Sequence, residues 1–217
     1  MASPLLSPAD AKRAAEILCG TYKDAHYYLD FSTPVELLVA AIMSAQTRDE
    51  TVNSITPALF RKYRSAADYA GASQAALAKD ISRVSFAGAK AKNIISACKI
   101  IVENYGGNVP GTADALVALP GIGRKTANTI LINAFGIVEG IPVDTWVIKL
   151  SQRIGFSQNS NPDRIEGDLM SFLPRRLWGT FAYVLKAHGK SLCGKVPVCS
   201  KCQIGSRCMR NGVVRSV

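Results

Sequence analysis

Acidic residues are scarce in this sequence. Among its 217 residues, Asp and Glu together number 16, whereas Lys and Arg number 26, so the formal net charge is +10. An excess of positive charge suits a polyanionic partner such as nucleic acid. The same excess also occurs in basic proteins whose charges serve only solubility, so charge alone does not assign a function.

Long hydrophobic runs are also missing. No stretch of 18 apolar residues occurs, so we expect no membrane span. Charged residues such as Asp10 and Lys12 interrupt the first 20 residues, which therefore lack a secretory signal. Strand-like alternation, internal repeats and low-complexity linkers are absent as well. The sequence predicts an all-α protein in the cytoplasm, at the nucleoid.

Apolar residues recur at helical spacing along most of the chain. Residues 33–36, with the sequence TPVE, have the features of a helix start: a capping threonine, a proline and a glutamate three residues after the cap. The helix that follows is apolar on nearly every face, which indicates a buried central helix. Further helices are expected at residues 8–22, 49–63, 73–81, 89–105, 145–155, 162–173 and 176–190.

Residues 119–127, with the sequence LPGIGRKTA, are the most informative segment. They predict two short helices joined by a glycine hairpin: one over residues 113–119, and one from Arg124 to about Phe135. Gly121 and Gly123 permit left-handed backbone angles and a close approach of the backbone. The free N–H groups that begin the second helix favour an anion such as DNA phosphate.

Lys125 and Asp144 are the candidate catalytic residues. Lys125 lies in the first turn of the second helix, where the helix dipole disfavours a cation. It therefore either contacts phosphate or acts as a nucleophile with a lowered pKa. Asp144 precedes the helix expected at residues 145–155, so it can cap that helix. It can also serve as the anionic partner of the Lys125 chemistry.

Four of the six cysteines are concentrated near the end of the chain. Cys193, Cys199, Cys202 and Cys208 have the spacing C-x5-C-x2-C-x5-C, and residues 193–217 contain no acidic residue. Four thiolates this close require a cation, and their spacing fits either zinc or an iron–sulfur cluster. Lys195, between the first two cysteines, is either a phosphate contact or a solubilising charge.

The remaining cysteines, Cys19 and Cys98, lie on apolar helical faces and are expected in the core.

Together these segments resemble the endonuclease III family of DNA glycosylases with associated AP lyase activity. The resemblance extends from about residue 29 to residue 208. It depends on residues 44–49 (SAQTRD), the hairpin, residues 143–145 (VDT), residues 188–190 (HGK) and the four cysteines. It implies a six-helix barrel domain at residues 27–137. It also implies a helical domain, residues 1–26 and 138–217, in which the four cysteines hold a [4Fe-4S] cluster.

The resemblance also implies a mechanism. A damaged base, an oxidised pyrimidine in this family, is extruded from double-stranded DNA into a cleft between the domains. Asp144 stabilises the charge that develops at the sugar C1′, and Lys125 attacks this carbon to form a Schiff base. β-Elimination then cleaves the strand 3′ to the abasic site. The enzyme is expected to act as a monomer.

The DNA contacts implied by the resemblance come from several segments. Gln46 matches the residue that fills the gap left by the extruded base, and Phe86 lies where a leucine commonly wedges the base stack. Phe86 can equally be an ordinary core residue. The other DNA contacts are assigned to Gly121, Gly123, Arg124 and Lys195.

Two alternatives stay open. One is a glycosylase directed at a mispaired base, and the other is a non-catalytic helix-hairpin-helix protein that uses Lys125 only to contact phosphate. Trp146 and Ala87 depart from the residues common in the family, which leaves the range of damaged bases open.

Overall fold

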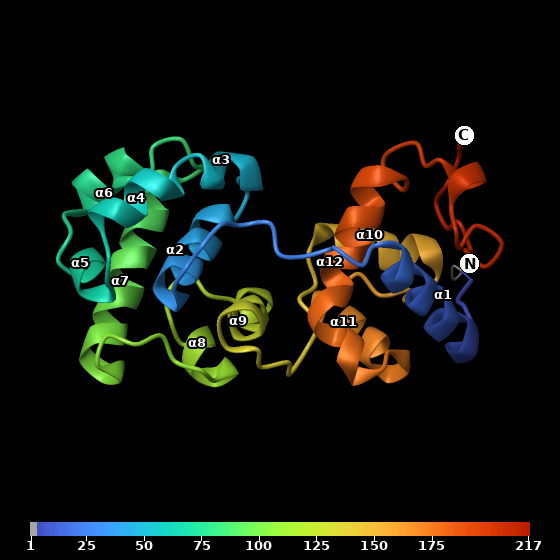
Figure 1. Ribbon diagram of the computed structural model, residues 1–217, viewed down its shortest axis with the longest axis horizontal. Coiled ribbons are helices and arrows are strands. Elements are labelled where there is room, and N and C mark those ends of the chain that lie inside the picture. Colours follow the sequence, from blue (N-terminus) through green and yellow to red (C-terminus); the bar gives the residue numbers. More distant parts are fainter. Residues whose placement is uncertain (1–3) are drawn as a thin grey trace. The chain divides into compact units, whose positions relative to one another are not determined.

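The computed structural model describes residues 4–217, and every regular element among these residues is helical. The predicted all-α fold class is therefore confirmed. The chain divides into two compact units (Figure 1). The central unit is Tyr28–Ile137, and the terminal unit combines the segment through Tyr27 with Val138–Val217. Within the described part of the chain, no helix has the length and apolar character needed to cross a membrane.

The central unit is built around a buried helix, α2 (Pro34–Ser44), in which every residue from Leu37 to Met43 is buried. The capping box predicted for this helix is present. The Thr33 hydroxyl accepts a hydrogen bond from the Glu36 N–H, and the Glu36 carboxylate accepts one from the Thr33 N–H, each at 3.2 Å. The helices that accompany α2 in this unit are α3 (Asp49–Asn53), α4 (Thr56–Lys62), α5 (Ala66–Ala70), α6 (Gln74–Asp80), α7 (Ala87–Tyr105), α8 (Ala113–Val117) and α9 (Arg124–Ile130), which continues as the π-helical turn η1 (Leu131–Phe135).

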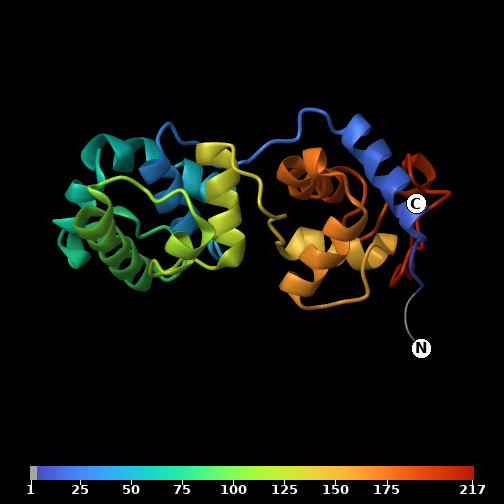
Figure 2. The same ribbon diagram turned by 90° about the horizontal axis from the view of Figure 1, so that it is seen from below.

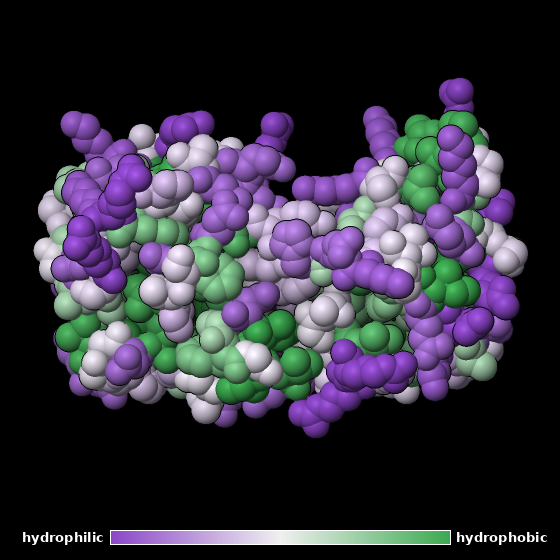
Figure 3. Space-filling model, viewed as in Figure 1, coloured by the Kyte–Doolittle hydropathy of each residue, from purple (hydrophilic) through white to green (hydrophobic). Residues whose placement is uncertain are grey.

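The terminal unit has its own apolar core, to which Leu18, Leu150 and Phe181 contribute fully buried side chains. The segment before its first helix lies beside the C-terminal residues (Figure 2), and the Asn211 side chain donates a 2.8 Å hydrogen bond to the Pro4 carbonyl. Hydrophilic side chains project from the face of the molecule shown in Figure 3. The helices of this unit are α1 (Pro8–Thr21), α10 (Thr145–Ile154), α11 (Pro162–Phe172), α12 (Arg175–Ser191) and the 3₁₀ turn η2 (Cys199–Lys201).

Two helical expectations differ from the structure. The helix expected at residues 49–63 is divided into α3 and α4, because Pro57 lacks the N–H group that would continue the helical hydrogen bonds from α3 into α4. Helix α5 was not expected. The sequence does contain a helix-start pattern for α5. Ser65 and Asp68 form a capping box, with hydrogen bonds of 3.0 and 3.2 Å between side chains and backbone N–H groups.

The capping box of α2 yields a test of stability. Replacing Thr33 with alanine removes the acceptor for the Glu36 N–H at the end of a buried helix. We expect Thr33→Ala to lower the free energy of unfolding by about 1 kcal/mol, measured by urea denaturation. Thr112→Ala is the matched control, because Thr112 occupies the same position before α8 without a side-chain capping bond. Equal losses in the two variants would contradict the role assigned to the capping box.

Candidate active site and DNA-contact surface

The glycine hairpin forms as predicted between α8 and α9. Leu119 and Ile122 anchor it in the core, and the Ile122 N–H donates a 3.1 Å hydrogen bond to the Leu119 carbonyl. Gly121 has a left-handed φ of +85°, and a Cβ atom there would lie 3.1 Å from the Asn93 side chain on α7. The hairpin therefore requires glycine at position 121 for two reasons, backbone conformation and close packing.

Gly123 differs from the expectation. Its φ of −96° is not left-handed, and a Cβ atom there would meet nothing within 4 Å. The residue serves as the N-cap of α9, which receives no side-chain capping bond. The space in front of the first turn thus stays free of a side chain, as an approaching anion would require.

Arg124 and Lys125 lie in the first turn of α9, and both are exposed. The Lys125 carbonyl accepts a 2.9 Å hydrogen bond from the Thr129 hydroxyl, so the backbone of Lys125 is held in the helix. Beyond it, Ala127 to Leu131 are buried. The lysine therefore projects from a well-packed helix.

Asp144, in the terminal unit, caps α10 as predicted. Its Oδ1 atom accepts 2.9 Å hydrogen bonds from the N–H groups of Trp146 and Val147. The other oxygen, Oδ2, has no hydrogen-bond partner within residues 4–217. The residues before Asp144 are fixed by Glu166, a buried side chain that accepts a 3.0 Å hydrogen bond from the Ile141 N–H. One carboxylate oxygen thus orients Asp144, and the other can face a substrate.

Trp146 and Gly189 pack closely beside this aspartate. A Cβ atom at position 189 would lie only 2.3 Å from the Trp146 ring, so the indole occupies the space above a glycine of α12. The Lys149 ammonium lies 5.1 Å from the centre of the same ring. The sequence did not reveal this packing, because its partners are distant in the chain.

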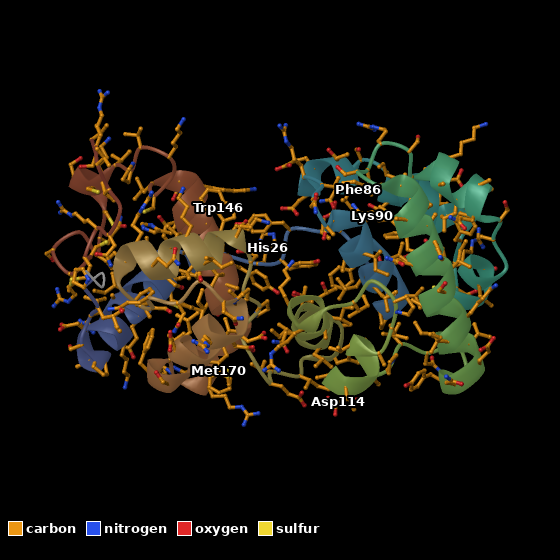
Figure 4. All side chains as sticks on the ribbon, turned by 180° about the vertical axis from the view of Figure 1, so that it is seen from behind. His26, Phe86, Lys90, Asp114, Trp146 and Met170 are labelled. Atoms are coloured by element: carbon orange, nitrogen blue, oxygen red, sulfur yellow. The ribbon has the colours of Figure 1, made fainter. Side chains whose placement is uncertain are left out.

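Gln46 and Phe86 are brought together on two adjoining loops of the central unit. Both have left-handed backbone conformations, with φ of 54° and 58°, although neither is glycine. The Ser85 hydroxyl donates a 2.9 Å hydrogen bond to the Gln46 carbonyl. Phe86 is 67% exposed, so the alternative that it is a core residue is wrong. Figure 4 shows Phe86 near Lys90. The sequence did not single out Lys90 as a functional residue.

All four cysteines of the C-terminal pattern line one cavity in the terminal unit. Their thiols are free, and burial is the main cause that raises the pKa values of Cys202 and Cys208, with a further contribution from neighbouring cysteines. Four thiolates lining one cavity, of which Cys193 is buried and the other three are half-buried, would be unfavourable without a cation. No three His, Cys, Asp or Glu side chains of residues 4–217 are grouped so as to hold a metal ion.

Polar groups around the cavity point toward the cysteine sulfurs. The Arg153 guanidinium lies 3.5 Å from the Cys193 sulfur, and the Arg210 N–H lies 3.4 Å from the Cys208 sulfur. The His188 Nε2 atom is 3.9 Å from the Cys202 sulfur. Donors of this kind stabilise negatively charged sulfur ligands. These donors are of the kind that surround a thiolate-ligated cation, although the cysteine sulfurs within residues 4–217 are not themselves grouped so as to hold one.

The other two cysteines have a different environment. Burial raises the pKa of Cys98 to about 12 and that of Cys19 to about 11. Cys98 is fully buried and Cys19 packs against the core of the terminal unit, as expected from the sequence. Lys195 is exposed on the loop between Cys193 and Cys199.

Comparison with known proteins identifies the class to which this fold and these residues belong. Residues 39–175 match the family described as "HhH-GPD superfamily base excision DNA repair protein". The chain belongs to this superfamily of helix-hairpin-helix DNA repair proteins.

Within the superfamily, the chain is a member of the endonuclease III family. It is 44% identical to endonuclease III of a Synechocystis species over 213 residues, which cover 96% of this chain and 97% of the relative. It is 39% identical to endonuclease III of Bacillus subtilis, covering 86% of both chains. A solved structure described as a trapped endonuclease III–DNA covalent intermediate is similar, with a TM-score of 0.89 and 34% identity over 94% of this chain and 96% of that one.

This membership makes the chain a DNA-binding enzyme, a DNA glycosylase and AP lyase of base excision repair.

The two hairpin glycines provide a matched pair of variants. Gly121→Ala forces a side chain into left-handed backbone and against Asn93, so we expect it to lower the free energy of unfolding by about 1 kcal/mol or more. Gly123→Ala meets neither obstacle and loses only the preference for glycine over alanine at an N-cap, so it should destabilise the protein less than Gly121→Ala. Urea denaturation measures both. The requirement for glycine at position 121 would be refuted if the two variants unfolded at the same urea concentration as the wild type.

Proposed function

We propose that the protein removes oxidised pyrimidines from double-stranded DNA and cleaves the strand by β-elimination, with Lys125 as nucleophile and Asp144 as electrostatic stabiliser. The observation that carries this proposal is an exposed lysine in the first turn of the uncapped helix α9. Support comes from the similarity to an endonuclease III that was trapped as a covalent intermediate with DNA.

The proposed chemistry follows from the two side chains. When the base leaves, positive charge develops at C1′, and the Asp144 carboxylate stabilises it. The neutral Lys125 amine forms a bond to C1′, and the sugar ring opens to give an imine. The imine makes the C2′ proton acidic. Loss of this proton breaks the C3′–O bond, which is the strand cleavage on the 3′ side.

The remaining contacts are assigned by position. Phosphates would be bound by the N–H groups around Gly121 and Gly123, by Arg124 and by Lys195. Gln46 would fill the gap left by the extruded base, and the exposed Phe86 would wedge the stack. The enzyme would act as a monomer at the nucleoid on duplexes that contain a damaged base or an abasic site.

The cysteine cavity is the proposed site of a [4Fe-4S] cluster with Cys193, Cys199, Cys202 and Cys208 as ligands. The free thiols and the polar groups directed at their sulfurs support this assignment. The cluster would cross-link the loops of residues 193–208, including the loop that carries Lys195. In this assignment the central unit is the six-helix barrel domain, and the terminal unit is the cluster domain.

Borohydride trapping tests the nucleophile. The wild-type protein and a duplex with an abasic site should yield a covalent adduct, because borohydride reduces the imine. Lys125→Gln should abolish the adduct and strand cleavage while keeping the fold, since the side chain is exposed. An undiminished adduct in Lys125→Gln would show that Lys125 is not the nucleophile and would leave it only the role of a phosphate contact. If the wild type itself formed none, the protein would be a non-catalytic DNA-binding protein or a glycosylase without lyase activity.

Asp144→Asn tests the electrostatic role apart from capping, because asparagine is an equally good N-cap. We expect this variant to bind DNA at least as tightly as the wild type, since one negative charge is removed. Base excision in single-turnover assays should fall by a factor on the order of 100 or more. Retained excision would reduce Asp144 to a helix cap.

Metal analysis tests the cluster. The purified protein should contain about four iron atoms per chain, and Cys199→Ser should lose iron together with stability of the terminal unit, because metal binding is coupled to folding. Cys19→Ser, outside the cavity, is the matched control and should keep its iron. Stoichiometric zinc without iron in anaerobically prepared protein would contradict the assignment.

A further inference from the structure

Lys90 is a buried lysine in the first turn of α7, with only 6% of its surface exposed. Its ammonium donates hydrogen bonds to the carbonyls of Met43 at 2.6 Å and Ala45 at 2.5 Å, and to the Thr47 hydroxyl at 3.0 Å. A lysine ammonium has three N–H donors, so each of them meets one oxygen. Lys90 therefore binds the chain where α2 ends and the loop of Gln46 begins.

Ser85 connects this loop to the loop of Phe86. The Ser85 N–H donates a 3.1 Å hydrogen bond to the Thr47 hydroxyl, and the Ser85 hydroxyl donates one to the Gln46 carbonyl. The Thr47 hydroxyl thus accepts from both Ser85 and Lys90. One hydrogen-bonded network holds the two loops together, and Lys90 is its buried centre.

The network explains how two strained residues are maintained. Left-handed backbone costs a non-glycine residue roughly 1–2 kcal/mol, and both Gln46 and Phe86 have it. Such strain persists only where surrounding contacts fix the conformation. The side chains of both residues are exposed, so packing of these side chains does not impose it.

The environment of Lys90 is unfavourable for stability alone. Its partners are neutral oxygens, and it forms no salt bridge within the described residues. Burial accordingly lowers its pKa. Burying a charged group without an opposite charge is costly, and a methionine of similar length would fill the space without this cost. The contribution of Lys90 is therefore to fix the geometry of the two loops that carry Gln46 and Phe86.

We propose that Lys90 is a positioning residue that holds Gln46 and Phe86 in the conformation in which they enter the base stack. The inference rests on the proposed function, in which these two side chains occupy and wedge the duplex. Lys90 touches no reacting atom in this scheme. It acts through the two loops, so its loss should affect steps that open a duplex more than the chemistry at an abasic sugar.

Lys90→Met tests this, because it keeps an unbranched side chain and removes the three donors. The rate of excision from a damaged duplex is compared with the rate of cleavage at an abasic site in single-stranded DNA, which has no stack to open. We expect the duplex-to-single-strand ratio to fall roughly tenfold or more, the scale of misplaced substrate-positioning groups. Lys99→Met, an exposed lysine of the same helix, should keep the wild-type ratio.

A double-mutant cycle separates positioning from general stability. In a Gln46→Ala, Phe86→Ala background, Lys90→Met should not change the ratio further, because the side chains through which it acts are gone. If Lys90→Met fails to fold, Ser85→Ala carries the test, since Ser85 is exposed and its hydroxyl links the same loops. Equal losses on both substrates, or an additive effect in the cycle, would overturn the proposal.

A binding measurement keeps this test independent of catalysis. A 2-aminopurine opposite an abasic site reports unstacking of the partner base by its fluorescence and requires no reaction. The change on binding should be smaller for Lys90→Met than for the wild type. If wild type failed in borohydride trapping, the proposed function would fall. If Lys90→Met gave the wild-type fluorescence change, the positioning role would fall.

Discussion

The backbone groups left unpaired at helix ends are the constraint on which this protein depends. A chain of short helices has many such ends, and each end needs a partner. Thr33 and Asp144 cap the starts of α2 and α10 with side-chain oxygens. Lys90 binds carbonyls at the end of α2. Several helices of the described chain begin without a side-chain cap, and α9 is the one among them whose N-cap, Gly123, has no side chain in front of the first turn.

The open start of α9 is the feature on which the proposed function depends. An uncapped helix start is a favourable place for phosphate, and Lys125 projects from the same turn. The position of this first turn is fixed by packing on both sides of it. Gly121 packs against Asn93 of α7, and Ala127 to Leu131 are buried. α7 also carries Lys90 and follows Phe86. A single long helix therefore supports both the hairpin and the loops that are proposed to enter the base stack.

In the terminal unit, the feature that needs a partner is the cysteine-containing segment at the end of the chain. Its last residues contain little regular structure, and the four cysteines line a cavity that guanidinium and backbone N–H groups surround. A bound cation would join the loops of residues 193–208, which contact the apolar core through Cys193 and Ile204. Asp144 is held by its bonds at the start of α10 and follows the segment that Glu166 fixes. The other end of the same helix carries Arg153, which contacts Cys193.

Sequence reasoning succeeded where the signal is local. The capping box at Thr33, the long helix up to Gly106 and the cap at Asp144 depend on residues only a few positions apart, and all three were predicted. Sequence reasoning failed where a local signal conflicted with another local signal or was too short to be recognised. The break before Pro57 and the short helix begun by Ser65 were missed, and Gly123 does not use the left-handed conformation that glycine permits.

The sequence by itself determined the helical fold class, the hairpin and the family, because helical periodicity, glycine spacing and cysteine spacing are local patterns. Only the tertiary structure decided that Phe86 is exposed, that Trp146 lies over Gly189, and that Lys90 is buried among three oxygens. The physical reason is that burial and hydrogen-bond partners arise from residues far apart in the chain. In the sequence, Lys90 is simply a lysine one turn before Ile94; in the fold, it holds two loops.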